Sequence, residues 1–203
     1  MSALFPLIVR GAQSSRRGAR LVGPVDLELT GDGTTVVVGP NGSGKTSLLA
    51  MLHGTNRLSG GEIQWAVPLE QAQSRQAFVF QRPVMLRRTV IDDIAYPLLV
   101  GSVGRADAHR AMIAQPELLF LDEPCAALDG RATREIEAIL AEVRQDGTSI
   151  ILSTHDLGQA RRLADNVVFM LRGQVHERGA AKTFFDAPKT PEAMAFLRGD
   201  IVE

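Results

Sequence analysis

The chemistry of this chain starts from a phosphate-binding pattern, G-x-x-x-x-G-K-[ST], which is spelled by Gly39-Pro40-Asn41-Gly42-Ser43-Gly44-Lys45-Thr46. Its glycines let the backbone turn N–H groups toward a phosphate, and the helix that follows adds partial positive charge. Lys45 can reach β- and γ-phosphates, while the Thr46 hydroxyl can ligate Mg²⁺. We therefore expect Gly39 to Ser47 to bind a nucleoside triphosphate.

A pair of carboxylates, Asp122 and Glu123, follows the apolar run Leu118–Leu121. Such a run is typical of a buried parallel strand, which delivers the residues after it to the C-terminal edge of a sheet. Asp122 can then hold Mg²⁺ through water beside the nucleotide, and Glu123 can polarise an attacking water. The pair indicates hydrolysis of a bound nucleotide.

Two other polar residues follow short apolar runs in the same way. Ile150–Thr154 precedes His155, and Ala77–Phe80 precedes Gln81. We expect both runs to be buried strands, and both side chains to lie at the sheet edge that carries Asp122.

Strands and helices on either side must position these groups. Thr35–Val38 predicts the strand before the phosphate-binding loop, and Ser47–Leu52 predicts the helix after it. Asp129 is a possible N-cap of another helix, because apolar residues recur behind it at helical spacing. Further helices are expected over 156–164 and over 191–197, the last packing Met194, Phe196 and Leu197.

In this order the motifs resemble the nucleotide-binding subunit of an ABC (ATP-binding cassette) transporter of the bacterial importer type. The resemblance covers about the whole chain. It rests on the Walker A loop Gly39–Thr46, the Q-loop Gln81, the Walker B residues Asp122 and Glu123, the D-loop Ala126–Asp129 and the switch His155.

The resemblance implies an α/β fold, a P-loop NTPase (RecA-like) core whose parallel sheet is flanked by helices, with antiparallel N-terminal strands. It implies one nucleotide-binding domain over residues 1–203. ATP and Mg²⁺ are the expected cofactors, with Mg²⁺ held partly through water by Thr46, Gln81 and Asp122. Glu123, His155 and Gln81 are the expected catalytic residues of an ATPase.

The same resemblance implies partners and a location. Transmembrane permease subunits and a second nucleotide-binding domain, in a homo- or heterodimer, are the expected partners. The chain is expected in the cytoplasm, peripheral on the inner face of the cell membrane. The compact chain and the stretch Val79–Leu86 look similar to bacterial import systems for inorganic oxyanions.

One motif of the family is absent. Its signature segment, L-S-G-G-Q, lies between the Q-loop and Walker B, but only forty residues separate Gln81 from Asp122 and none spells it. The helical subdomain is therefore expected to be largely missing, with the truncation around residues 87–110. Leu58–Glu62 repeats four letters of the signature, but Ser-Gly-Gly before alternating apolar residues predicts a turn that leads into a strand.

The missing signature keeps two other functions open. A catalytically impaired nucleotide-binding or interaction protein, from an internally deleted gene, is the first. A non-transport NTPase such as a P-loop kinase is the second, and Gln81, Asp129 and His155 argue against it.

Composition excludes several other classes of protein. The 203 residues are 45% hydrophobic and 22% charged, as in ordinary globular proteins. A formal net charge of −1 without a basic stripe argues against a nucleic-acid partner. The lone cysteine, Cys125, excludes an internal disulfide, and no apolar run approaches the ~20 residues of a membrane span. The loop with Arg16 and Arg17 has no aromatic residue, so either arginine could stack on a base or be solvated.

Overall fold

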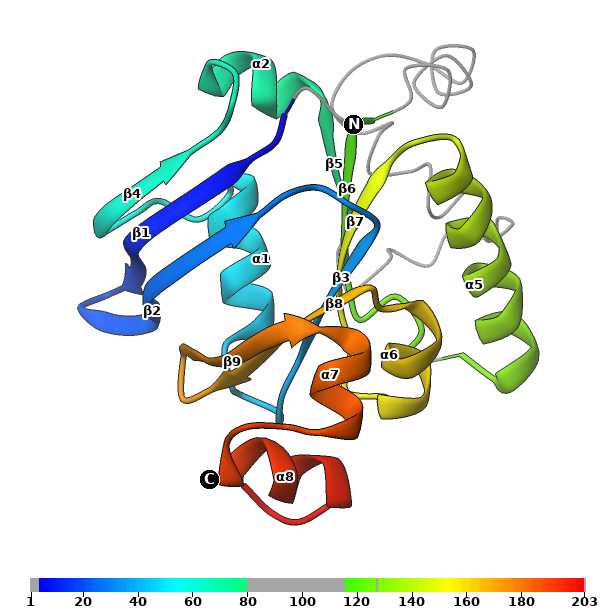
Figure 1. Cartoon of the computed structure of the whole chain (residues 1–203). Helices are drawn as coiled ribbons and strands as arrows, with labels where there is room; N and C mark the ends of the chain where they lie inside the picture. Colours follow the sequence, from blue (N-terminus) through cyan, green and yellow to red (C-terminus); the bar gives the residue numbers. More distant parts are fainter. Residues whose placement is uncertain (1–3, 80–115, 127, 203) are drawn as a thin grey trace.

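The structure is a computed structural model that describes residues 4–79, 116–126 and 128–202. These residues form two sheets, and helices cover both faces of the larger one (Figure 1). Gln81 and the segment around 87–110, where a shortened helical subdomain is expected, lie outside the described residues.

The larger sheet of the described chain has six strands in the order β5-β6-β7-β3-β8-β9. They pair in parallel except for β9, which runs antiparallel to β8. Every residue of β3, β6 and β7 is buried, as expected for parallel strands covered on both faces. The strands are β3 (Thr34–Val38), β5 (Gln76–Val79), β6 (Leu118–Asp122), β7 (Ser149–Ser153), β8 (Asn166–Leu171) and β9 (Gln174–Ala180).

The smaller sheet is antiparallel, with the order β2-β1-β4 for β1 (Leu7–Arg16), β2 (Ala19–Leu29) and β4 (Gly60–Gln64). The expected antiparallel N-terminal strands are thus confirmed. The four letters that repeat the signature run into β4, and the Ser59 N–H donates to the Gln13 carbonyl at 2.8 Å. The expected strand is confirmed, but it begins at Gly60, so both glycines belong to β4 and only a bend at Ser59 precedes it.

Helix α1 lies between the two sheets, where it contacts β1 and β2 on one side and β6 and β7 on the other (Figure 1). Helices α5, α6 and α7 lie beyond the opposite face of the larger sheet (Figure 1). None of the helices that the structure describes is long and apolar enough to cross a membrane. The helices are α1 (Lys45–His53), α2 (Leu69–Ser74), α5 (Gly130–Gln145), α6 (Leu157–Leu163), α7 (Ala181–Asp186) and α8 (Pro191–Arg198).

The strands of the larger sheet divide their side chains between two cores, because successive residues of a strand point to opposite faces. In β6, Leu118 and Phe120 belong to the core that contains α1 and the smaller sheet. Leu119 and Leu121 belong to the core that contains α5, α6 and α7. This two-sided packing holds the C-terminal ends of β6 and β7 in fixed register.

The helix starts follow the sequence closely. Asp129 caps α5 by accepting from the Arg131 and Ala132 N–H groups, and Asp156 caps α6 by accepting from Gln159. The expectation for α8 is wrong at Met194, whose side chain is among the exposed large hydrophobic residues, while Ala193 is fully buried. Whether a side chain of α8 is buried therefore depends on which side of the helix it occupies rather than on its size.

A buried carboxylate on β9 anchors α8. Glu177 accepts from the N–H groups of Lys189 and Thr190 at 2.8 and 2.9 Å, and from the Thr190 hydroxyl at 2.8 Å. The same hydroxyl accepts from the Ala193 N–H at 3.2 Å and so caps the helix. Burial acts to raise the pKa of Glu177, but these hydrogen bonds outweigh it and hold the pKa below its ordinary value.

We expect Glu177→Gln to lower the free energy of unfolding at pH 7 by about 1–3 kcal/mol, since the amide NH₂ would face N–H donors. Because the folded pKa is depressed, the contribution is present above the unfolded value of about 4.3 and is lost as pH falls through the folded pKa. Urea unfolding of both proteins from pH 7 to pH 3 checks this. Glu62→Gln, at an exposed ion pair with Arg10, is the control and should change little. A stability difference that grows toward low pH would contradict the assignment.

Candidate functional site

The phosphate-binding pattern forms the loop between β3 and α1, as predicted. Gly44 is the N-cap of α1 with a φ of 99°, and as a glycine it supplies no side-chain hydrogen bond to the first turn. The N–H groups at the start of α1 therefore remain available to an anion, which the helix dipole also attracts.

The loop passes so close to β8 that a side chain cannot fit at Gly39. With a φ of 151°, an added Cβ would lie 2.3 Å from the Met170 carbonyl oxygen. The hydroxyl of Ser43 is buried in the same loop without a hydrogen-bond partner among the described residues. A phosphate oxygen fits this donor, because buried hydroxyls are rarely left unpaired.

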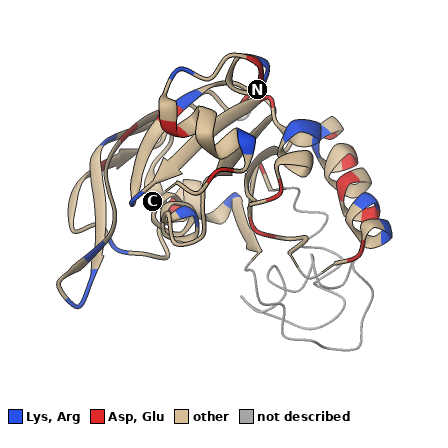
Figure 2. Cartoon of the chain, turned by 90° about the horizontal axis from the view of Figure 1, so that it is seen from below, with Lys and Arg blue, Asp and Glu red and all other residues tan. Residues whose placement is uncertain are grey.

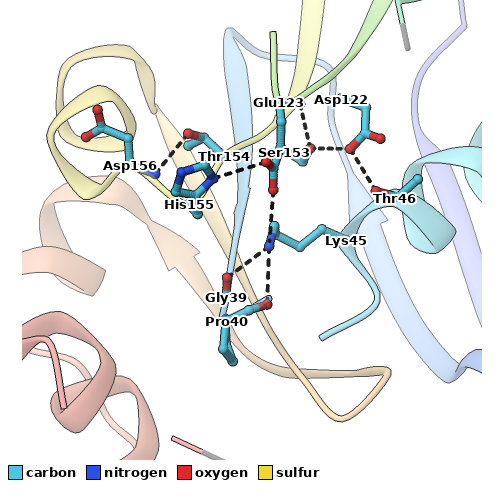
Figure 3. A network of polar contacts seen from close by, with 10 residues as sticks. All are labelled: Gly39, Pro40, Lys45, Thr46, Asp122, Glu123, Ser153, Thr154, His155 and Asp156. Carbon is cyan, nitrogen blue, oxygen red and sulfur yellow. Dashed lines mark hydrogen bonds and ion pairs between the residues drawn. The ribbon is translucent and has the colours of Figure 1, made fainter. Parts of the chain in front are cut away.

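Lys45 places a buried ammonium group at the centre of the site (Figure 3). Its side chain is only 4% exposed. Its Nζ donates to the carbonyl oxygens of Gly39 and Pro40 at 3.0 and 3.2 Å, and lies 3.5 Å from Glu123 Oε1. The positive charge is thus held at the mouth of the loop, where it can neutralise phosphate charge.

Two oxygen ligands suited to Mg²⁺ come from different elements. The Thr46 hydroxyl on α1 donates to Asp122 Oδ1 at the end of β6, at 3.1 Å. A hydroxyl and a carboxylate are the hard oxygen donors that Mg²⁺ takes. The residues present therefore fit the metal that the pattern implies.

Glu123 follows β6 in a left-handed backbone conformation, with a φ of 47°. This geometry turns its carboxylate toward the loop, and Oε2 lies 3.0 Å from His155 Nδ1 (Figure 3). Left-handed geometry costs a residue with a side chain roughly 1–2 kcal/mol, and such strain concentrates at functional sites. Glu123 is therefore held between Lys45 and His155.

Lys45, Thr46, Glu123 and His155 are among the residues that line a cavity of about 650 Å³, large enough for a nucleotide. Arg20 and Leu21 of β2 are among the residues that line it, and Arg20 is the only arginine of the described residues to do so. Arg16 and Arg17, which the sequence offers for base stacking, are not among its lining residues. The lining residues are Arg20, Leu21, Asn41, Gly42, Gly44, Lys45, Thr46, Ser47, Glu123, Ala126 and His155.

Two known proteins with similar sequences are both named as import ATP-binding proteins. The model of the ABC transporter family matches residues 22–97. The phosphate import ATP-binding protein PstB 2 of Natronomonas pharaonis is 30% identical, over 97% of this chain and 87% of that protein. The sulfate/thiosulfate import ATP-binding protein CysA of Mesorhizobium japonicum is also 30% identical, over 85% of this chain and 63% of that protein.

The chain belongs to the ABC transporter family, as an ATP-binding protein.

Solved structures agree on the fold. The protein cbiO1 of Clostridium perfringens, part of an ABC transporter complex, has a TM-score of 0.72 and 20% identity, with 96% of each chain covered. A dimeric ATP-binding cassette bound to ADP and phosphate has a TM-score of 0.68 and 18% identity, over 86% of this chain and 98% of that one. At these identities the likeness shows the α/β ABC ATPase fold alone.

In this ABC protein a second turn supports the phosphate-binding loop. Gly173, between β8 and β9, donates its N–H to the Ser43 carbonyl at 2.9 Å and accepts from the Gly23 N–H of β2 at 2.7 Å. It thereby joins the loop to the strand that carries Arg20 and Leu21. One residue therefore links the phosphate-binding loop to β2, and both contribute lining residues to the cavity.

The structure brings together most of the site residues that the sequence predicts. Lys45, Thr46, Asp122, Glu123 and His155 converge as expected, whereas Gln81 lies outside the described residues. Sequence reasoning missed three members of the site: Arg20, Gly173, and Ser153, whose hydroxyl donates to Asp122 Oδ1. The dipeptide Arg172-Gly173 after an apolar run predicts a turn, but not what that turn contacts.

We expect Gly173→Ala to weaken ATP binding by roughly several-fold, because an added Cβ would lie 3.2 Å from the Leu21 carbonyl oxygen and displace β2 or the loop. Gly147→Ala is the matched control, since Gly147 has a similar left-handed φ of 95° but no atom within 4 Å of an added Cβ. Both variants should lose similar stability in thermal melts. Equal ATP affinities by calorimetry would show that the turn does not hold the site.

Proposed function

We propose that this chain is the ATP-binding subunit of an ABC importer, in which ATP binding and hydrolysis drive transport through permease subunits. The observation that carries the proposal is the assembled site: Lys45, Glu123 and His155 line a cavity at the start of α1, and Asp122 accepts from the Thr46 hydroxyl at its edge. The proposed location is the cytoplasm, on the inner face of the cell membrane. The whole of residues 1–203 is proposed to be one nucleotide-binding domain with a shortened helical subdomain around 87–110.

The proposed roles follow from position. The loop from Gly39 to Ser47 binds the phosphates of ATP, with Lys45 neutralising their charge. Thr46 and Asp122, together with Gln81, hold Mg²⁺, which supplies charge neutralisation at the transferring phosphate. Glu123 orients and polarises the attacking water, and His155 holds Glu123 on the side away from Lys45.

Import is supported by the relatives. Three relatives are named for the import of phosphate, sulfate/thiosulfate and tungstate, which are inorganic oxyanions. Others are named for L-cystine and methionine. An inorganic oxyanion is therefore the proposed solute. A nucleic-acid partner is not proposed, because the net charge is −1 and α5, the helix at the right of Figure 2, carries both acidic and basic residues.

A second nucleotide-binding domain is the proposed partner that completes the site. No stretch between Gln81 and Asp122 spells the signature, which the family places against the ATP of the opposite subunit. Alignment with the Natronomonas pharaonis protein runs over 249 positions, more than the 203 residues of this chain, as expected if a segment is missing. A heterodimer with an intact cassette would contain one complete site.

Lys45→Met tests the nucleotide site itself. We expect it to weaken Mg-ATP binding by about 10-fold or more, because a charge-assisted hydrogen bond to phosphate contributes roughly 1.5–3 kcal/mol. Isothermal titration calorimetry of both proteins measures the effect. Lys182→Met, on α7, is the control and should bind as the wild type does. Equal affinities of Lys45→Met and wild type would contradict the assignment.

Phosphate release from Mg-ATP tests the missing signature. Because electrostatic stabilisation by the signature is proposed to be absent, we expect the isolated chain to release phosphate scarcely faster than Glu123→Gln at all protein concentrations. Addition of an intact cassette should raise the rate of the wild type and not of the variant. Release by the chain alone that rises cooperatively with its concentration and vanishes in Glu123→Gln would show a working homodimer instead.

A further inference from the structure

One buried serine joins the two carboxylate residues of the site. Ser153 is the last residue of β7 and is fully buried. In the parallel register of β6 and β7 it lies opposite Asp122, and on its other side it pairs with Val37 of β3. The residue is thus enclosed between the strand that carries Asp122 and the strand that leads into the phosphate-binding loop.

The hydroxyl of Ser153 uses both its donor and an acceptor within the site (Figure 3). It donates to Asp122 Oδ1 at 2.6 Å, a short hydrogen bond typical of a hydroxyl and a carboxylate. It accepts from the Glu123 N–H at 3.0 Å. A single oxygen atom therefore orients the carboxylate of one residue and the backbone of the next.

The hydrogen bond from the Glu123 N–H has a second acceptor, whereas the bond to Asp122 has no equal substitute among the described residues. The Glu123 N–H also reaches the Ser153 carbonyl oxygen at 3.1 Å, so the backbone of Glu123 retains an acceptor without the hydroxyl. Among the described residues, Ser153 and Thr46 both donate to Asp122 Oδ1, and removal of the Ser153 hydroxyl removes the shorter of these bonds. Loss of the hydroxyl should therefore act mainly on Asp122.

We propose that Ser153 is a positioning residue, whose hydroxyl holds the Asp122 carboxylate in the orientation that Mg²⁺ requires when it binds together with ATP. The inference rests on the proposed function, because it concerns the same Mg-ATP site. Outer hydrogen-bond partners of metal ligands commonly set metal affinity by orienting the ligand. Ser153 does this from a strand rather than from the loops, so its oxygen is rigidly placed.

The chain contains a matched control on the same strand. Ser149, at the other end of β7, is also buried, and its hydroxyl donates to the Gly31 carbonyl at 2.6 Å. Ser149 and Ser153 lie opposite the first and last residues of β6. Ser149→Ala thus removes a hydrogen bond of equal length from another buried position of the same strand, away from the site.

The experiment is calorimetric titration of ATP into the whole chain at a series of fixed Mg²⁺ concentrations, including none. Mg²⁺ is expected to increase the affinity for ATP. We expect Ser153→Ala to raise the Mg²⁺ concentration that gives half of this increase by about 10-fold, while the ATP affinity without Mg²⁺ stays unchanged. Ser149→Ala should match the wild type at every Mg²⁺ concentration. Should Ser153→Ala not fold, Ser153→Cys keeps a side chain with only a weak donor in place and should show a smaller shift in the same direction.

Two outcomes would overturn the inference in different ways. In the first, the wild type binds ATP more tightly in the presence of Mg²⁺, and the variants at 153 and 149 show the same Mg²⁺ dependence of ATP affinity. The role of Ser153 is then only structural and the proposed function stands. If the wild type itself binds ATP no more tightly with Mg²⁺, the proposed Mg-ATP site fails and the role of Ser153 fails with it.

Discussion

A buried positive charge organises this molecule. The ammonium of Lys45 is almost wholly removed from water, and a buried charge is tolerable only when it is paired and hydrogen-bonded. Carbonyl oxygens of the loop surround it on one side and the carboxylate of Glu123 faces it on the other. The loop and the end of β6 must therefore lie together, although about 80 residues separate them in the chain.

The larger sheet makes that approach possible. Because β7 lies between β6 and β3, the ends of three neighbouring parallel strands lie along one edge, where the loop begins. Cores on both faces hold these strands, and the strain at Glu123 is supported by the hydrogen bonds from its N–H to Ser153. The rigid sheet thus holds the ammonium of Lys45 and the carboxylate of Glu123 at a fixed separation of 3.5 Å.

Most of the fold was predictable from local pattern. All-apolar runs such as Leu118–Leu121 predict buried strands, and polar caps such as Asp129 and Asp156 mark helix starts. Prediction failed where a face had to be assigned within a short helix: Met194 of α8 is exposed, although its apolar side chain favours burial. With eight residues, α8 offers too few turns for periodicity to define the buried side.

The sequence by itself determined the chemistry of the site, because each catalytic or binding motif is recognised from consecutive residues. These motifs are the loop at Gly39–Thr46, the Asp122-Glu123 pair and His155 after its apolar run. Only the tertiary structure decided which other residues support that chemistry. Ser153 meets Asp122, and Gly173 meets Ser43, through strand register and turn placement across long stretches of chain. Arg20 rather than Arg16 or Arg17 borders the cavity for the same reason. Where both faces of a strand are apolar, sequence alone does not specify its register or its neighbours.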